Sequence, residues 1–336
     1  MHGSTEQLRP DAATQTVSSA EGGSMAMLTK VARLLIVIGL LAGFTVSRAS
    51  QLTDGQIITV CPQGPPACQF SRIQEAINVA TDEAIILISP GLYIEREFLK
   101  ISKNLSLVGS DPRSVRLLTS QVSIGWSAAV VNIQDLTILG DVSVFDRAQT
   151  TLSNVKVVGS IEVAPHGAEQ PRTSRIILIN VHVQESTFFA LFVGPAAEAV
   201  VIGSELLGRL VASVGAKVWV SDTQIEIPTL SRYSRTGIEA YEGSDLALLR
   251  VKIFSVGHGV LARAAHLHIE ESQLVATNGW GLALMIEACS LNLPSDATYE
   301  GLITGRNNEI TGARELGDVC PSKLEFLKTP EGGQYP

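Results

Sequence analysis

The chain has 336 residues, of which 45% are hydrophobic and 17% are charged, and its formal net charge is −8. This much apolar material can build a continuous core and argues against a disordered chain. The acidic balance, without any run of Lys or Arg, argues against a nucleic-acid partner, because binding phosphates needs a basic face.

Residues 28–50 have the pattern of a secretory signal peptide. Lys30 and Arg33 form a short basic region, residues 34–46 are apolar apart from one Thr, and a small-x-small sequence ends at Ala49. We therefore expect residues 1–49 to be an N-terminal extension and signal peptide that is cleaved near Ala49. An uncleaved anchor is the alternative, and the sequence leaves open the start positions Met1, Met25 and Met27.

The expected destination is secreted, periplasmic or at the cell surface, and no second apolar run is long enough to span a membrane in the mature chain. All four cysteines follow the expected cleavage point: Cys61, Cys68, Cys289 and Cys320. An even number of cysteines in an exported chain predicts disulfides, and we expect the pairs Cys61–Cys68 and Cys289–Cys320. No histidine stands at ligand spacing and no CxxC occurs, so we expect neither a metal site nor a cofactor.

Residues 50–103 are predicted to form an N-terminal cap. The sequence from Ser71 to Gln74 is a capping box, S-x-x-Q, and predicts a helix over 72–80 whose apolar residues cover the first coil of the fold. A strand is expected over 84–89, followed by a Pro-Gly turn. At the other end, residues 319–336 are expected to form a C-terminal cap and tail.

Between these caps a four-residue unit recurs: a turn-tolerant residue, a small or apolar residue, a variable residue, and then Ile, Leu or Val. Successive units are 19 to 36 residues apart, which predicts a solenoid with a base period near 20 residues. Gly and Asn at the first position suit a left-handed backbone conformation. The units begin at Asn104, Asp135, Asn154, Asn180, Gly203, Asp222, Arg250, Glu271 and Asn307.

Short alternating runs accompany the units and predict strands with one buried face. A second series, spaced by 22 residues, begins at Gly237, Gly259 and Gly281, so each coil should hold at least two strands. Aliphatic residues stand two positions before seven of the units: Ile133, Leu152, Leu178, Val201, Val220, Leu248 and Ile269.

Stacked about 4.8 Å apart, such coils bury a continuous aliphatic column. Helical repeats are the main rival, but the segments lack i, i+3, i+4 patterning and are rich in Val and Ile. We expect an all-β fold, a single-stranded right-handed parallel β-helix of about nine coils, with its coils over 104–318.

The opening of the chain resembles that of extracellular bacterial right-handed parallel β-helix repeat proteins of the pectin-lyase-like superfamily, including NosD-like carbohydrate-binding and sugar-hydrolase domains. The resemblance extends over about residues 55–312, although beyond residue 110 only the general coil pattern matches. It implies the fold and a glycan ligand. The residues that carry it are 61–68, 70–77, 88–95 and 103–109.

The site motifs of the enzymes in this superfamily are absent or broken. Gly91, Tyr93 and Glu95 resemble the opening motif of pectin methylesterases, but the later paired-Asp and Arg motifs have no counterpart. Of the polygalacturonase motifs only Gly257-His258-Gly259 occurs, and we interpret it as a turn between strands. Because glycoside hydrolysis usually needs two carboxylates, we assign no catalytic residue and lean against an enzyme.

Insertions between coils are where a solenoid carries function, and the longest are residues 164–174, 226–236 and 285–300. The second feeds the strand that begins at Gly237, on which alternate residues should point outward. The candidate ligand-binding patch, suited to an acidic sugar chain, is Arg232, Tyr233, Arg235, Glu239, Tyr241 and Arg263. The plainer alternative is a solvated face with a Glu–Arg contact between coils.

The function we expect is an exported β-helix protein that binds a polysaccharide or a cell-surface partner without catalysis. Two alternatives stay open. One is a divergent polysaccharide lyase, glycoside hydrolase or pectin-esterase-like enzyme, and the other is a purely structural surface protein.

Overall fold

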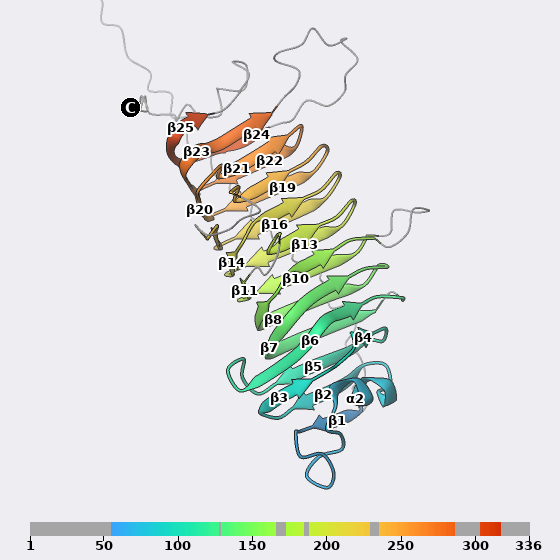
Figure 1. The fold of residues 1–336 in the computed structure, drawn as a ribbon. Coiled ribbons are helices and arrows are strands. Elements are labelled where there is room, and N and C mark those ends of the chain that lie inside the picture. The colour runs from blue at the N-terminus through green and yellow to red at the C-terminus, as the bar shows by residue number, and fades with distance from the viewer. Residues whose placement is uncertain are drawn as a thin grey trace, which may run out of the picture. The chain divides into compact units, whose positions relative to one another are not determined.

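A computed structural model describes residues 55–127, 129–165, 173–184, 188–228, 235–285 and 303–316. Within these ranges the chain is all-β apart from one short helix, α2 (Ile73–Val79), and every strand pairing is parallel. The chain is a right-handed parallel β-helix, as predicted, and the stack is close to the expected nine coils (Figure 1). Among the described residues, no helix is long and apolar enough to cross a membrane.

Each coil contributes a strand to three sheets, which we number in the order in which the chain passes through them. The longest strands bend from one sheet into the next, so that their parts belong to different sheets. Sheet 1 consists of β1 (Ile57–Val60), β2 (Ala84–Ile88), β5 (Leu105–Gly109), the starts of β7 (Val130–Val144) and β8 (Gln149–Val158), β10 (Arg175–Ile179), β13 (Glu198–Ile202), β16 (Lys217–Ser221), β19 (Asp245–Leu249), β22 (His266–Glu270) and β24 (Ile303–Arg306).

Sheets 2 and 3 follow in the same order of coils. Sheet 2 consists of β3 (Gly91–Ile94), the start of β6 (Val115–Ile124), later parts of β7 and β8, β11 (His182–Gln184), β14 (Glu205–Leu207), β17 (Gln224–Glu226), β20 (Lys252–Ser255) and the starts of β23 (Gln273–Met285) and β25 (Glu309–Leu316). Sheet 3 consists of β4 (Leu99–Ile101), the ends of β6 and β7, β9 (Ile161–Val163), β12 (Leu191–Val193), β15 (Leu210–Ala212), β18 (Ile238–Ala240), β21 (Val260–Arg263) and the ends of β23 and β25.

Alternate side chains of the strands fill the inside of the stack. In β16, Val218 and Val220 are buried while Lys217 is exposed, and the same alternation recurs in the paired strands β13 and β19. The seven aliphatic residues predicted to precede the turns are all buried, with at most 1% of their surface exposed. The predicted strand phase is therefore confirmed over these coils.

The turn from sheet 1 into sheet 2 is made by the first residue of each repeat unit, in left-handed backbone conformation. Eight of the nine predicted units have φ between +51° and +59° at this residue, from Asp135 to Asn307. The prediction at Asn104 was wrong. The residues that follow it, Leu105 and Leu107, lie in β5 of sheet 1, so Asn104 stands before this strand and not at the turn after it. In that coil a longer connection, residues 110–114, joins β5 to β6. The four-residue unit at Asn104 therefore coincided with the alternating residues of a strand and did not mark a turn.

Helix α2 lies against β1, β2 and β4 at the N-terminal end of the stack (Figure 1). Its Ile73, Ala76 and Ile77 are buried, as predicted. The predicted capping box is wrong, because the N-cap residue is Arg72 and its side chain makes no capping bond. The Glu95 carboxylate, brought in by β3, accepts hydrogen bonds from the first helical N–H groups instead.

The disulfide Cys61–Cys68 is present, as predicted. Three other predictions lie outside the described residues: the signal peptide in 1–49, the pair Cys289–Cys320, and the C-terminal cap over 319–336.

The three predicted insertions all fall between strands. Residues 164–174 join sheet 3 to sheet 1, and the insertion at 285–300 begins where β23 ends, before β24 of sheet 1. Residues 227–237 join β17 of sheet 2 to β18 of sheet 3, so this insertion borders a different edge of the stack.

Candidate functional site

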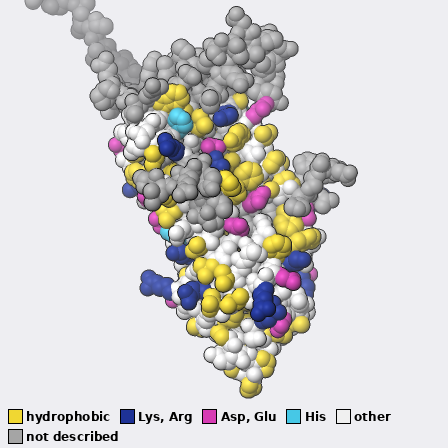
Figure 2. Space-filling model, in the orientation of Figure 1, with side chains coloured by type: hydrophobic (Ala, Val, Ile, Leu, Met, Phe, Trp, Pro, Cys, Tyr) yellow, Lys and Arg dark blue, Asp and Glu magenta, His cyan; other side chains and the backbone are white. Residues whose placement is uncertain are grey.

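A shallow groove of about 430 Å³ lies on the outer face of sheet 3. Strands β12, β15 and β18 cross it side by side, because Phe192, Val211 and Glu239 are register partners that point outward from neighbouring coils. Charged side chains of both signs stand among apolar ones on the molecular face drawn in Figure 2. The groove is lined by Phe188, Phe189, Phe192, Arg209, Val211, Ser213, Val214, Glu239 and Tyr241.

Glu239 is the charged centre of the groove. It points outward because its neighbours Ile238 and Ala240 point into the core. An Arg209 guanidinium nitrogen lies 3.1 Å from Glu239 Oε1, and the Tyr241 hydroxyl donates a hydrogen bond of 3.0 Å to Oε2. Only 14% of the Glu239 side chain and 21% of that of Arg209 are exposed. This half-buried ion pair holds both planar groups in one orientation, because each is bonded to the other and Tyr241 also bonds the carboxylate.

Tyr241 and Arg263 extend the site toward the next coil. Burial, together with the hydrogen bond to Glu239, raises the pKa of the Tyr241 hydroxyl, so it stays a neutral donor. The Arg263 guanidinium carbon stands 5.6 Å from the centre of the Tyr241 ring, within cation–π range. The exposed Arg263 thus covers one face of a ring whose edge is tied to Glu239.

Aromatic rings form the other wall of the groove. Phe192 points outward from β12, and its ring lies 5.4 Å from that of Phe189. Phe188, just before them, is 50% exposed. An exposed phenyl face beside a fixed carboxylate and guanidinium combines apolar contact with directional hydrogen bonding, as ligand sites commonly do.

His258 lies in the turn from sheet 2 into sheet 3, next to the groove. The backbone N–H of Trp280 donates to its Nδ1 over 3.2 Å, so the ring proton of the neutral form is on Nε2. The two rings lie 5.2 Å apart. Burial lowers the pKa of His258, and the nearby charge of Glu239 opposes that shift. The interpretation of Gly257-His258-Gly259 as a turn between strands is confirmed, since it joins β20 to β21.

The structure brings together three residues of the predicted patch and leaves the others apart or undescribed. Glu239, Tyr241 and Arg263 lie on neighbouring coils as the 22-residue step predicted. Arg235 is exposed, and its carbonyl accepts a hydrogen bond from the Gly257 N–H. Arg232 and Tyr233 lie outside the described residues.

Sequence reasoning missed Arg209 and the phenylalanines. The signal was present, because Leu210-Val211-Ala212 pairs in register with Ile238-Glu239-Ala240 and so places Arg209 beside the start of β18. The step between these strands is 28 residues instead of 22, which hid the relationship in the sequence. Phe192 was missed for a related reason, because it lies on a strand of sheet 3 and the four-residue unit stands at the turn from sheet 1 into sheet 2.

The groove holds one carboxylate among the described residues that line it, that of Glu239. Glycoside hydrolases usually place two carboxyl groups roughly 5–10 Å apart across the scissile bond. In the part of the chain that the structure describes, no group of three or more His, Cys, Asp or Glu side chains could hold a metal ion. The described arrangement suits binding by hydrogen bonds and aromatic stacking.

No family model and no curated protein sequence matches this chain. Solved structures similar to it include an alginate lyase from Paenibacillus sp. str. FPU-7, with 12% identity over 79% of this chain and 98% of the other and a TM-score of 0.46. The pectin methylesterase PemA from Erwinia chrysanthemi has 12% identity, covers 80% and 94% of the two chains and has a TM-score of 0.40.

A third similar structure, ORF18 of Geobacillus virus E2, has 10% identity and a TM-score of 0.43; the match covers 85% of this chain and 63% of that one. Identities and TM-scores of this size assign no activity to the chain. The fold rests on the strand pairing described above.

Proposed function

We propose that this chain is an exported β-helix protein that binds a polysaccharide, either free or on a cell-surface partner, along the groove of sheet 3 and does not cleave it. The Cys61–Cys68 disulfide supports export, because disulfides persist in oxidising compartments. The signal-like pattern of residues 28–50 supports the same location.

The observation that carries the binding proposal is the fixed Arg209–Glu239–Tyr241 cluster beside the exposed ring of Phe188. Sugars present apolar C–H faces and hydroxyl edges. The phenyl ring can take the first, while the carboxylate and guanidinium, already held in one orientation, can take the second with little loss of side-chain entropy.

The charges around the groove favour an acidic sugar chain. Arg263 is exposed beside Tyr241, and Arg209 already neutralises Glu239, so the Arg263 guanidinium is left for a ligand carboxylate; the exposed Arg235, in the connection before β18, offers a second for a ligand that extends past the groove. Guanidinium groups bind carboxylates in a bidentate manner, which gives both affinity and orientation.

One observation favours the second candidate, a divergent lyase, hydrolase or esterase. The His258 imidazole, whose pKa is lowered by burial, carries its neutral-form proton on Nε2 and lies near enough to Glu239 for that residue's charge to oppose the shift. A proton donor and a carboxylate are two of the parts that such enzymes use. The experiment below therefore measures products as well as binding.

The test is calorimetric titration of the purified protein with hexagalacturonate and with hexamannuronate. We expect Phe188→Ala to weaken binding about tenfold, the effect of losing roughly 1.4 kcal/mol of ring contact. The matched control is Phe98→Ala, because Phe98 is 51% exposed but lies far along the stack in the connection before β4.

Equal loss in both variants, or no binding to either oligosaccharide, would remove the support for the groove as an acidic-glycan site and favour a structural role. Release of reducing ends or unsaturated products during the titration would favour the enzyme instead.

A further inference from the structure

A second hollow, of about 610 Å³, lies on the other side of the coils, where sheet 1 turns into sheet 2. It spans the four coils that carry β11, β14, β17 and β20, about 14 Å at a spacing near 4.8 Å. Two rows of side chains line it, one from the turns and one from the first outward position of the strands. The rows are Asn180, Gly203, Asp222 and Arg250, and His182, Glu205, Gln224 and Lys252.

The row of turn residues forms a ladder of hydrogen bonds along the stack. Asn154 donates to Asp135 over 2.6 Å, and Asn180 donates to Asn154 over 3.2 Å. After a gap the ladder resumes, with Arg250 making two hydrogen bonds to Asp222, of 2.6 and 2.8 Å. The turn residues thus pair from coil to coil on both sides of one missing rung.

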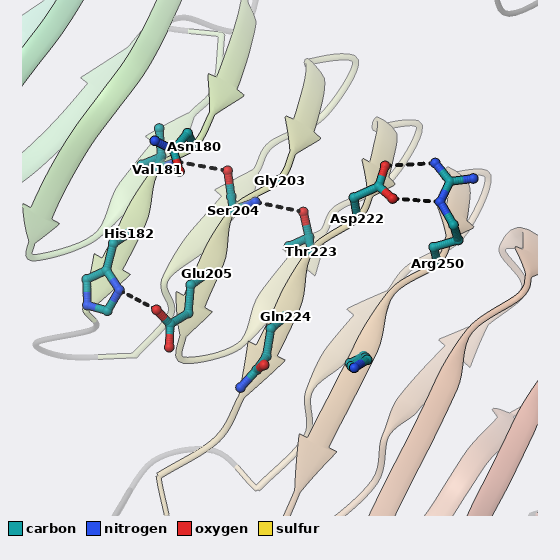
Figure 3. Close-up of a pocket in the computed structure, with 11 residues that line it drawn as sticks. Asn180, Val181, His182, Gly203, Ser204, Glu205, Asp222, Thr223, Gln224 and Arg250 are labelled. Atoms are coloured by element: carbon teal, nitrogen blue, oxygen red, sulfur yellow. Dashed lines mark hydrogen bonds and ion pairs between the residues drawn. The ribbon is translucent and has the colours of Figure 1, made fainter.

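The missing rung is Gly203, which lies between Asn180 and Asp222 (Figure 3). Its φ of +58° is the left-handed conformation shared by the other turn residues, and no heavy atom lies within 4 Å of where a Cβ would stand. Asparagine tolerates this conformation, as Asn154 and Asn180 do. The open slot is therefore a feature of the side chain at this position and not a requirement of the backbone.

The slot offers hydrogen-bonding groups of both kinds and no net charge. Among the described residues nothing donates to Asn180 Oδ1, and the Asp222 carboxylate, whose pKa is lowered by its hydrogen bonds with Arg250, stands beyond the gap. On the strand row, the Glu205 carboxylate accepts a hydrogen bond of 2.7 Å from His182 Nδ1. The two carboxylates of the lining are matched by Arg250 and Lys252.

We infer that this slot binds the hydroxyl groups of a neutral sugar chain laid across the coils, at a site independent of the groove on sheet 3. A lining with balanced charge has no preference for a strongly acidic or basic ligand, whereas hydroxyls act as donors and acceptors at once. Ser204 and Thr223 lie between the two rows, and their hydroxyl oxygens accept hydrogen bonds from the backbone of adjacent coils (Figure 3). The floor of the hollow is therefore polar, and it leaves the outward side chains of the two rows to contact the ligand. The length of the hollow suits several linked sugars.

Filling the slot tests the inference. Gly203→Asn adds the missing rung in a left-handed conformation that asparagine adopts at small cost, as Asn154 and Asn180 do, so the protein should melt close to the parent, and its affinity for the neutral sugar should fall at least tenfold. Gly215→Asn is the matched control, since Gly215 has φ +68° and its nearest heavy atom is 4.0 Å from the added Cβ. Gly215 lies in the connection between β15 and β16, away from the hollow.

The probes are cellohexaose, mannohexaose and xylohexaose, titrated by calorimetry into the parent and each variant, with hexagalacturonate as the acidic comparison. A second variant, Gln224→Ala with Lys252→Ala, removes outward side chains and should weaken the same probe if Gly203→Asn fails to fold. Failure of all three neutral probes to bind the parent overturns the inference, as does parent affinity in both variants. Binding of hexagalacturonate that Gly203→Asn leaves unchanged would belong to the groove on sheet 3, so the two sites stand or fall separately.

Discussion

The Glu95 carboxylate accepts a hydrogen bond of 2.9 Å from the backbone N–H of Ile73, at the first turn of helix α2. The same oxygen accepts from Gln74, and the other oxygen binds Arg72 at 2.9 Å. Two residues earlier, the buried Tyr93 hydroxyl donates to the Ser89 carbonyl over 2.6 Å. The motif that resembles the opening of pectin methylesterases therefore joins the N-terminal helix to the first coil of this chain.

Replacing Glu95 by Ala should lower the free energy of unfolding by roughly 2–3 kcal/mol. Among the described residues, the change removes the side-chain acceptors of the Ile73 and Gln74 N–H groups, and the first of these N–H groups is buried. Chemical denaturation with circular dichroism measures it. Glu97→Ala is the control, because Glu97 is exposed and two residues further on. A loss below about 0.5 kcal/mol for Glu95→Ala would show that water satisfies these N–H groups in place of the carboxylate.

The difference between what the sequence could and could not predict is visible at these residues. The alternation of Val218 and Val220 with outward neighbours is local, so the sequence alone predicts which side is buried. The cap of α2 comes from a residue more than 20 positions later, and a local S-x-x-Q match cannot reveal it. The repeating sequence pattern was enough to predict the coils. The contacts between side chains of different coils could be found only once the pairing register of the strands was known.

The candidate site shows the same limit. Glu239 and Tyr241 were predicted because the pattern of their strand recurs 22 residues later, in the strand that pairs with it. Their strongest partner, Arg209, lies on the preceding coil, and that coil is separated by an insertion of variable length. Where successive strands are equally spaced in the sequence, their register can be inferred from the spacing. Where an insertion of unknown length separates two strands, the spacing no longer gives their register.

Val220→Asp should unfold the protein at room temperature. Val220 is fully buried in β16, and an unpaired carboxylate there costs several kcal/mol against a typical total of roughly 5–15 kcal/mol. Lys217→Ser on the same strand should melt close to the parent, since the Lys217 side chain is 66% exposed. Differential scanning fluorimetry compares the two, and equal melting temperatures would contradict the strand phase.

Peptide mapping without reductant should recover Cys61 joined to Cys68, as the structure shows. It should also recover Cys289 joined to Cys320, which remains a prediction from cysteine number and export. A peptide that joins Cys68 to Cys289, or an alkylated thiol at Cys289, would refute the second pair.

His258 should make stability fall as the pH drops below about 6.5, the ordinary value for histidine. Because burial holds its folded-state pKa below that value, the unfolded chain binds the proton first, and protonation favours unfolding until the pH passes below the folded pKa as well. The measurement is the difference in unfolding free energy between the parent and His258→Gln from pH 7.5 to pH 5. We expect this difference to shrink toward acid pH, and a difference that stays constant or grows would contradict the shift.

The last prediction separates the two exposed arginines, Arg235 and Arg263, from the half-buried Arg209. Arg235→Ala with Arg263→Ala should abolish binding of hexagalacturonate and leave the melting temperature almost unchanged, because exposed ionic and cation–π contacts contribute about 0–1 kcal/mol. Arg209→Ala should behave differently. It leaves the mostly buried Glu239 without its cation, so stability should fall by a measurable amount along with affinity.

Calorimetric titration and thermal melting of both variants distinguish these outcomes. If the double variant keeps the parent's affinity, the acidic chain binds elsewhere. If it instead melts far lower, Arg235 and Arg263 hold coils together, and the outward face is the plain solvated surface that the sequence also allowed. A stable double variant without affinity, beside a destabilised Arg209→Ala, would mean that Arg209 positions Glu239 while the outer arginines meet the ligand.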